Sequence, residues 1–168
     1  AHAVSGADAR RPASAGAAGG GDARKAWDYL RDEGYGGRDG VGAGDSAGGN
    51  LARVLTHLLK AAGRRLPRAL ILLSPWTDMT ASGKSYQERA DIDPVLTLNY
   101  IHAVRDAYAH SRDWSDPCLS PLFADPSGFP PPPPHAGPPE LRARHLPPPA
   151  SPLGPAAGPL RQAAGPDC

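Results

Sequence analysis

Residues 44–48 read Gly-Asp-Ser-Ala-Gly, and they constrain the fold of this chain more than any other stretch. A short strand candidate at 40–44 leads into them, and residues 47–62 follow with the spacing of an amphipathic helix. A serine between two glycines at a strand-to-helix junction is typical of a nucleophile elbow, whose strained turn pushes the serine hydroxyl outward. We therefore expect Ser46 to lie at a tight turn between a strand and a helix.

The residues around Ser46 each have an expected task in such a turn. A Cβ at Gly44 or at Gly48 is expected to collide with the neighbouring strand or helix. The amide N–H of Ala47 should point into the space where an oxyanion would form. Ser46 is accordingly the candidate nucleophile and Ala47 the candidate oxyanion donor. The alternative is an ordinary Gly-rich turn in which the serine only caps the helix.

The pattern that follows favours the elbow. Apolar residues recur on one face of the expected helix, at Leu51, Val54, Leu55, Leu58, Leu59 and Ala62. The all-apolar run 69–73 then predicts a strand that is buried on both faces of a parallel sheet. Strand, turn, helix and strand make one βαβ unit. The chain is therefore predicted to be an α/β protein.

Other elements are predicted more coarsely. Residues 22–33 and 98–110 should each form an amphipathic helix, the first with Trp27 on its apolar face. A helical turn is expected at 86–89. Residues 111–129 are interrupted by prolines and should be irregular.

Several blocks of the chain, in the same order, resemble the hormone-sensitive-lipase-like branch of the α/β-hydrolases. The blocks are residues 44–52 (GDSAGGNLA), 72–78 (LLSPWTD), 93–97 (DPVLT), 116–117 (DP) and 120–125 (SPLFAD). The resemblance implies a partial α/β-hydrolase core, with packing helices on parallel strands. It also implies a serine carboxylesterase or lipase that acts on small acyl esters through an acyl-enzyme, without a cofactor.

The same resemblance extends the site beyond the serine and its neighbour. It places Gly44, Asp45, Gly48 and Gly49 in the signature that supports the elbow of Ser46. Asp45 is expected to orient the elbow through hydrogen bonds, and not to be the acid of a triad. No Cys/His or His/Glu spacing indicates a metal site.

Two parts of the family machinery have no counterpart in this sequence. No His-Gly-Gly-Gly loop precedes the elbow, although that loop supplies the family's other oxyanion donors. After residue 129 the acidic residues are Glu140 and Asp167, and the histidines are His135 and His145. Only Glu140 before His145 keeps the order Ser, acid, His, and they lie too close together to be separated by a strand and a helix. We therefore expect the chain to be inactive, or nearly so.

Some chemically suggestive residues have plain structural interpretations. His57 is expected on the helix face opposite the leucines, as a surface histidine. Asp78 and Asp91 are expected to act as loop or cap residues. Trp76 and Trp114 could line an acyl pocket, but buried packing is the default for tryptophan.

Both ends have the composition of disordered chain. Val4 is the only large apolar residue in 1–21, and most of the 21 prolines lie from residue 130 onward. We predict a disordered or non-family segment at 1–21, a partial α/β-hydrolase domain at 22–130 and a Pro-rich disordered tail at 131–168. The abrupt breaks suggest an incomplete or frame-disrupted copy, translated in a shifted reading frame at its ends. A real, divergent low-complexity tail is the alternative.

Charge and composition limit the partners. A formal net charge of +1 argues against a nucleic-acid partner, and no apolar run is long enough to span a membrane. Cys118 and Cys168 are too few for a disulfide framework, which favours a reduced, cytoplasmic setting. No specific protein partner is indicated. A non-catalytic small-molecule-binding protein of the same fold and a non-folding fragment stay open as alternatives.

Overall fold

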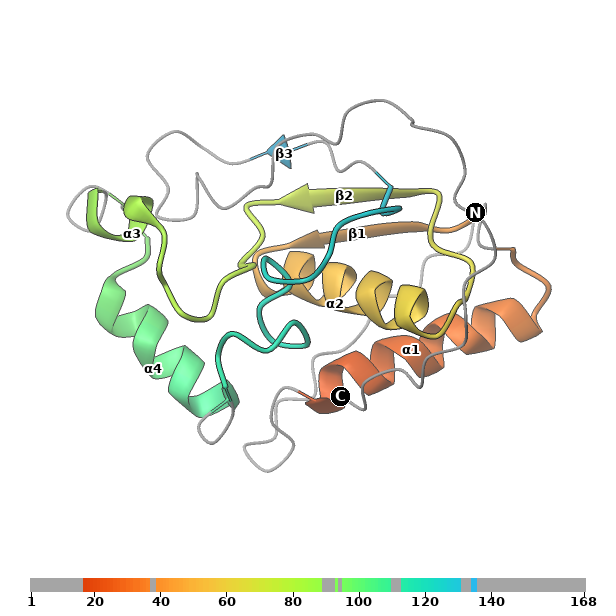
Figure 1. The fold of residues 1–168 in the computed structure, drawn as a ribbon, viewed down its shortest axis with the longest axis horizontal. Coiled ribbons are helices and arrows are strands. Elements are labelled where there is room, and N and C mark those ends of the chain that lie inside the picture. Colours follow the sequence, from red (N-terminus) through yellow and green to blue (C-terminus); the bar gives the residue numbers. More distant parts are fainter. Residues whose placement is uncertain are drawn as a thin grey trace.

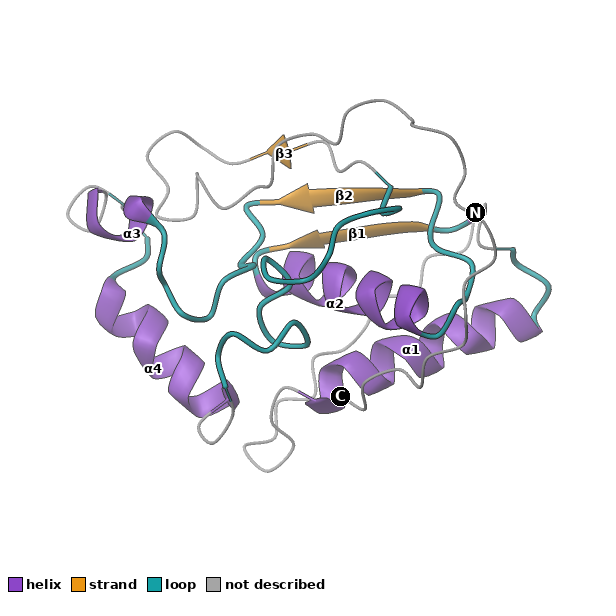
Figure 2. Cartoon of the chain, viewed as in Figure 1, coloured by secondary structure: helices purple, strands orange, loops and turns teal. Residues whose placement is uncertain are grey.

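The computed structural model describes residues 17–36, 39–88, 93, 95–109, 113–130 and 134–135. The elements are α1 (Ala17–Asp32), β1 (Val41–Asp45), α2 (Ala47–Ala61), β2 (Ala69–Leu73), α3 (Lys84–Glu88), α4 (Leu98–Ala109) and β3 (Pro134–His135). Helices and parallel strands alternate in the first half of the chain (Figures 1 and 2). The predicted α/β class is confirmed.

The sheet has the order β1-β2-β3, and all of its described pairings are parallel. The register of β1 and β2 runs from Val41 opposite Ala69 to Asp45 opposite Leu73. The two strands therefore end side by side. Since ligands of open α/β sheets bind beyond the carboxyl ends of strands, this edge is where a site is expected. The turn after β1 and the loop after β2 both begin there.

Helix α2 packs on β1 and β2, and α1 packs on the other side of α2 (Figure 1). Val54, Leu58 and Leu59 of the predicted stripe are buried. The approach to the sheet is close because β1 contributes small residues: a Cβ at Gly42 would lie 2.7 Å from Leu70 Cδ2. The predicted core face is thus confirmed at these three positions, whereas Leu51 and Leu55 are half-buried and Ala62 is exposed.

The opposite face of the sheet is partly exposed and carries no helix among the described residues, which corrects one prediction. Strand β2 was expected to be buried on both faces, but Ile71 is 43 % exposed and Leu73 47 %. Val41 on β1 is 50 % exposed on the same side. The reason is the placement of the helices, because α1 and α2 both lie on one side of the strands (Figure 2).

Helix α1 begins at Ala17, five residues before the predicted start at 22. The last residues of the segment 1–21, predicted to be disordered, therefore belong to a helix, whereas residues 1–16 lie outside the described part. Packing explains the longer helix. A Cβ at Gly20 would lie 3.3 Å from both Val54 and Leu58, so the missing side chain lets α1 approach α2 closely.

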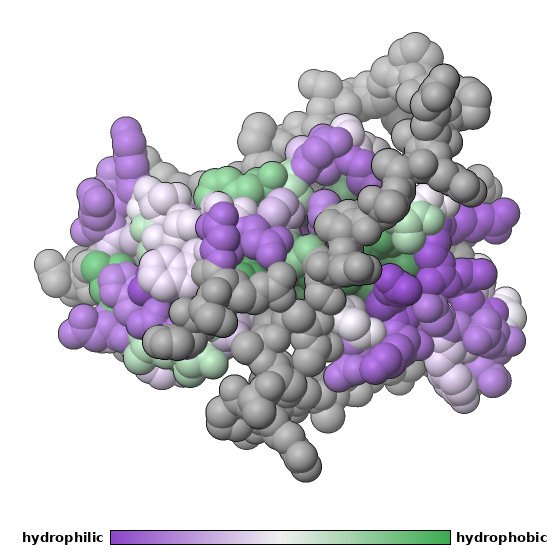
Figure 3. Space-filling model, turned by 60° about the horizontal axis from the view of Figure 1, so that its bottom comes forward, coloured by the Kyte–Doolittle hydropathy of each residue, from purple (hydrophilic) through white to green (hydrophobic). Residues whose placement is uncertain are grey.

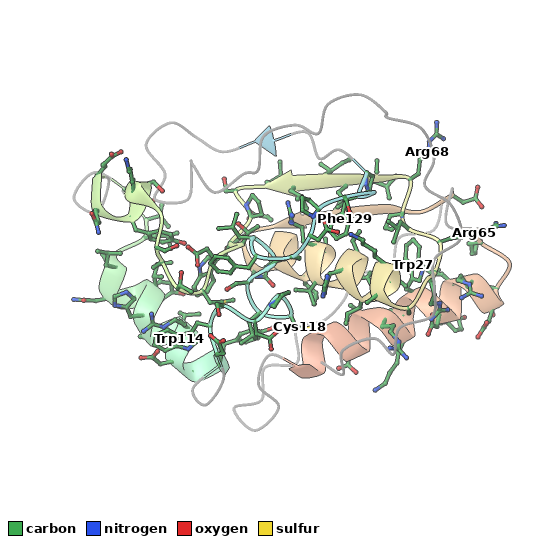
Figure 4. The ribbon with its side chains drawn as sticks, in the orientation of Figure 1. Trp27, Arg65, Arg68, Trp114, Cys118 and Phe129 are labelled. Atoms are coloured by element: carbon green, nitrogen blue, oxygen red, sulfur yellow. The ribbon has the colours of Figure 1, made fainter. Side chains whose placement is uncertain are left out.

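Trp27 of α1 is buried as predicted, and its ring packs against Gly40 just before β1 (Figure 4). The outer side of α1 is mostly charged (Figure 3). Among the described residues, no helix is long and apolar enough to cross a membrane.

Residues 113–130, here called the return segment, pass along α2 and contact its polar face (Figure 1). They are irregular, as predicted. Arg53 Nη2 of α2 donates to Pro121 O at 3.4 Å, and Lys60 Nζ donates to Asp125 Oδ2 at 2.6 Å. Phe129 lies beside α2 with its ring centroid 5.5 Å from Lys60 Nζ (Figure 4).

The return segment explains why the polar face of α2 is buried. His57 was predicted to be a surface histidine but is half-buried on this face. Burial, followed by the nearby charge of Lys60, lowers the pKa of its imidazole. The apolar stripe alone could not reveal this, because the covering segment is irregular and distant in the sequence.

A second apolar cluster lies beside the sheet and joins α3, α4 and the loop after β2. Its buried members are Trp76, Met79, Tyr86, Ile101, Ala109 and Leu119. Trp114 packs against this cluster, and the guanidinium carbon of Arg105 lies 3.4 Å from the Trp114 ring centroid (Figure 4). Both tryptophans are therefore packing residues, as their default interpretation predicts.

Acid should weaken the attachment of the return segment to α2. Hydrogen bonds from the Lys60 ammonium, and then from Ser127, hold the pKa of the Asp125 carboxyl well below its usual range. A depressed folded-state pKa means that this stabilisation is fully present above about pH 4 to 5, and is lost as pH falls further. Because Asp125 is 69 % exposed, the effect is limited to about 0.5–1 kcal/mol.

Urea unfolding at pH 7, 5 and 3 checks this expectation. Asp125→Asn should be less stable than the unmodified chain at pH 7 and 5, and the difference should shrink at pH 3. Asp22→Asn, which removes an exposed carboxylate paired with Lys25 inside α1, is the matched control. A difference that stays constant down to pH 3 would contradict the role of the Asp125 charge.

Candidate active site

Ser46 occupies the junction between β1 and α2 with φ 54° and ψ −115°. Residues other than glycine rarely adopt this backbone conformation, and such strain clusters at functional sites. The Ser46 side chain makes no capping hydrogen bond to α2. The alternative of a plain serine cap is therefore wrong, and the predicted strand–turn–helix setting of Ser46 is confirmed.

Backbone hydrogen bonds hold this strained residue on both sides. The Ser46 N–H donates to Leu73 O at 3.0 Å. The Ser46 carbonyl accepts from the N–H of Asn50 at 3.2 Å and from the N–H of Trp76 at 3.0 Å. A sparsely populated conformation persists only where its surroundings fix it. Here the end of β2 and the loop that follows it do so.

The glycines of the elbow are not equivalent. A Cβ at Gly44 would lie 2.3 Å from both the carbonyl carbon and the oxygen of Gly48, so no side chain fits there. A Cβ at Gly48 would meet nothing within 4 Å, and this residue is exposed. The prediction is thus correct for Gly44 and wrong for Gly48. The crowded helix position is Gly49, whose added Cβ would lie 2.7 Å from Pro75 Cβ.

Of the two residues that flank Ser46, Asp45 differs from its expected arrangement. Asp45 is exposed on the partly exposed face of the sheet, and its carboxylate makes no hydrogen bond within the part of the chain that the structure describes. The predicted orienting hydrogen bonds are therefore not found. Ala47 is the first residue of α2, where amide groups have no intrahelical acceptor. Its N–H has no acceptor among the described residues.

Asn50 is the residue that sequence reasoning missed. It is only 4 % exposed, and its Nδ2 donates to Trp76 O at 2.7 Å and to Leu119 O at 2.8 Å. Both donor hydrogens of the amide are used. The available signal was a polar residue, one helical turn after Ser46, inside the block 44–52 that carries the family resemblance.

Histidines and acids do not gather at Ser46 within the described residues. His57 is eleven residues further along α2, which places it about 16 Å away along the helix axis, beyond reach for proton transfer. Asp78 is fully buried and accepts hydrogen bonds from Thr80 and Ser82 of its own turn, so it is a loop residue as predicted. Asp91 lies outside the described residues. So do Glu140, His145 and Asp167, and of His135 only the backbone is described.

A sequence profile of the alpha/beta hydrolase fold matches residues 11–132, which is most of the chain. The chain belongs to the α/β-hydrolase fold family. The match begins before the predicted domain start at 22 and ends two residues beyond the predicted break at 130. The matched range includes the elbow, the return segment and helices α1 to α4.

Two curated relatives of this chain are an acetyl-hydrolase and an esterase. An acetyl-hydrolase of Streptomyces hygroscopicus is 35 % identical over 89 residues, which are 53 % of this chain and 30 % of the relative. An esterase of Acinetobacter venetianus is 35 % identical over 95 residues, covering 56 % of this chain and 31 % of that protein. The chain therefore spans about a third of the length of the curated relatives it matches.

Solved structures of similar proteins give the same result. A bacterial esterase of the hormone-sensitive lipase family matches with a TM-score of 0.65 and 34 % identity, over 67 % of this chain and 38 % of that one. A hormone-sensitive lipase from a metagenome library matches with a TM-score of 0.72 and 30 % identity, over 75 % and 42 %. The likeness to the hormone-sensitive-lipase-like branch is thus confirmed.

Proposed function

We propose that this α/β-hydrolase chain carries the nucleophile of a carboxylic ester hydrolase of the esterase or lipase type. The observation that supports this most directly is the strained backbone of Ser46 between β1 and α2. In the proposed reaction the Ser46 oxygen attacks the carbonyl carbon of the ester. The N–H of Ala47 donates to the oxygen that becomes negative, and the alcohol leaves to give an acyl-enzyme.

The proton transfers of this reaction need a base and an acid that orients it. The serine proton must pass to the departing alkoxide, and a water molecule must then be deprotonated to hydrolyse the acyl-enzyme. His57, about 16 Å from Ser46 along the helix axis, is too far away to do this. Loss of the triad partners removes several orders of magnitude of rate and leaves only what the elbow contributes. We therefore propose that the 168-residue chain turns over esters very slowly or not at all.

The substrate class proposed here is supported by the same site and by the names of the relatives, acetyl-hydrolase and esterase. We propose a small acyl ester, whose carbonyl a serine can attack without a metal or organic cofactor. The cytoplasmic location and the lack of a nucleic-acid or specific protein partner stay predictions from composition.

If no base serves Ser46, an activated ester should acylate the enzyme faster than the acyl-enzyme is hydrolysed. The p-nitrophenolate group leaves without being protonated and the Ser46 proton passes to solvent, so acylation by p-nitrophenyl acetate can proceed slowly without a histidine. Hydrolysis of the acetyl-enzyme still needs a base to deprotonate water, so the acetyl group should accumulate on Ser46. We expect steady-state turnover near background together with selective acetylation of the tryptic peptide 39–53, whose only serine is Ser46. Peptide mass spectrometry over several hours measures both.

The control for that experiment is Ser46→Ala, in which peptide 39–53 should stay unmodified. Exposed serines such as Ser115 and Ser127 are the internal reference. Acetylation of Ser46 no faster than of these serines would contradict the proposed nucleophile. Turnover that disappears in Ser46→Ala would instead contradict the proposed inactivity. A tight small-molecule complex without acetylation would favour the non-catalytic binding protein.

A further inference from the structure

Asn50 makes more hydrogen bonds than its place in α2 requires. Its backbone N–H makes the first helical bond, to Ser46 O at 3.2 Å. Its side chain is buried and donates to two carbonyl groups outside the helix, those of Trp76 and Leu119. A surface position on a helix would expose such an amide to water. Here the return segment and the loop after β2 enclose it.

Two of these bonds, together with one from Trp76, form a closed ring around the elbow. The Ser46 carbonyl accepts from the N–H of Trp76, the carbonyl of Trp76 accepts from the side chain of Asn50, and the N–H of Asn50 returns to the Ser46 carbonyl. Each member of the ring holds the other two in place. The peptide group after Ser46 is therefore fixed by Asn50 directly and, through Trp76, a second time.

We propose that Asn50 is the positioning residue of the elbow, which holds Ser46 in its strained conformation. The direction of the Ser46 hydroxyl and of the Ala47 N–H depends on that conformation, so Asn50 acts on the reaction through Ser46. Its importance for catalysis rests on the proposed function. The mechanical coupling between Asn50 and Ser46 does not.

The chemistry of the side chain supports asparagine at this place. Both acceptors are backbone carbonyl oxygens, so the side chain must supply two hydrogens and no negative charge. Aspartate has the same shape but would place a carboxylate against two carbonyl oxygens. Leucine has a similar volume but leaves both carbonyl groups without a donor.

The bond to Leu119 extends the positioning role to the return segment. Leu119 is 69 residues from Asn50 in the sequence, and its carbonyl is 2.8 Å from the same Nδ2 that reaches Trp76. The Asn50 amide thus attaches the return segment directly to the elbow. Movement of the return segment is therefore expected to change the backbone conformation of Ser46.

A double-mutant cycle tests the coupling. Glycine adopts the Ser46 conformation without steric strain, so Ser46→Gly should raise the ratio of folded to unfolded chain about fivefold, strain relief exceeding the entropy cost of glycine. In the Asn50→Leu background the elbow is free to relax, and only the glycine cost remains. There Ser46→Gly should give no gain or a loss. Urea unfolding of the four chains measures the cycle.

Thr56→Val is the matched control, because it also removes a buried polar group of α2. The Thr56 hydroxyl bonds to Ala52 O inside the same helix and does not reach the elbow. The fivefold gain from Ser46→Gly should persist in this background. An equal gain in the Asn50→Leu background would make Asn50 a purely structural residue and overturn the proposal.

A milder substitution keeps the test available if Asn50→Leu does not fold. Asn50→Ser retains a hydroxyl donor and leaves space for water, and it should reduce the gain from Ser46→Gly only in part. A full gain in that variant would also overturn the proposal. Acetylation of peptide 39–53 separates the two proposals: no acetylation in the unmodified chain defeats the hydrolase function, whereas the cycle can still show coupling.

Discussion

Gly44→Ala should destabilise the folded chain by about 3 kcal/mol or more, the range of severe core overpacking and backbone displacement. The added Cβ would lie 2.3 Å from two backbone atoms of Gly48 and 2.6 Å from Gly49 N. Backbone atoms cannot rotate away as a side chain can, so β1 and α2 would have to separate. Thermal and urea unfolding, followed by circular dichroism, measure the loss.

Gly48→Ala is the control, and the opposite sign is expected. Its Cβ would point into open space at the start of α2, and alanine favours a helix over glycine by up to about 1 kcal/mol. The pair thus distinguishes the tight side of the elbow from its open side. If both substitutions had the same effect, the backbone of the elbow would differ from the one described.

Arg53→Met should stabilise the chain, by about 1–3 kcal/mol, because it removes a buried charge that lacks a good partner. Arg53 is 2 % exposed, and burial lowers the pKa of its guanidinium. Its partners are Pro121 O at 3.4 Å and the ring of Phe129 at 5.9 Å. Within the described part of the chain its Nε has no hydrogen-bond partner and no carboxylate pairs with it.

Methionine has a similar length to the arginine stem and can pack against Phe129. Lys60→Met is the comparison, since Lys60 lies two turns further along α2 and does have a carboxylate partner, Asp125. That substitution should lower stability or leave it unchanged. Urea unfolding at pH 7 measures both. A loss of stability in Arg53→Met would mean that its weak contacts compensate the burial of the charge.

The elements around the elbow could be predicted from the sequence because local patterns determine them. The spacing of the leucines predicted the start of α2 correctly and its end to within one residue. The apolar run 69–73 coincides with β2. The strand before Ser46 was predicted one residue early, at 40–44 in place of Val41–Asp45. These predictions succeed because the residues that specify a turn, helix or strand lie within or next to that element.

The remaining differences arise from contacts between distant segments. Gly48 and Gly49 are both plausible as crowded positions until Pro75 is placed beside one of them. The Gly-rich start of α1 has low helix propensity, so the sequence pattern did not predict a helix there. Its packing on α2 stabilises it, and this contact is between distant segments. The apolar sequence of β2 likewise predicts burial on both faces of the sheet. Whether each face is in fact buried depends on which side the helices pack.

The shifted reading frame stays a prediction that the encoding nucleotide sequence can test. The family match ends at residue 132, close to the predicted break at 130. A neighbouring frame that encodes a strand-like run followed by an acid would support the idea. If neither neighbouring frame does so after residue 131, the Pro-rich tail is a genuine part of the protein.

The partners of Asn50 have a consequence for the order of folding. They lie 26 and 69 residues away from it in the sequence, and closing loops of that length slows the formation of the contacts inside them. The bend at Ser46 is therefore expected to reach its final shape late, after α2 itself has formed. On the ribosome, Leu119 must have left the exit tunnel before the nucleophile is locked in place.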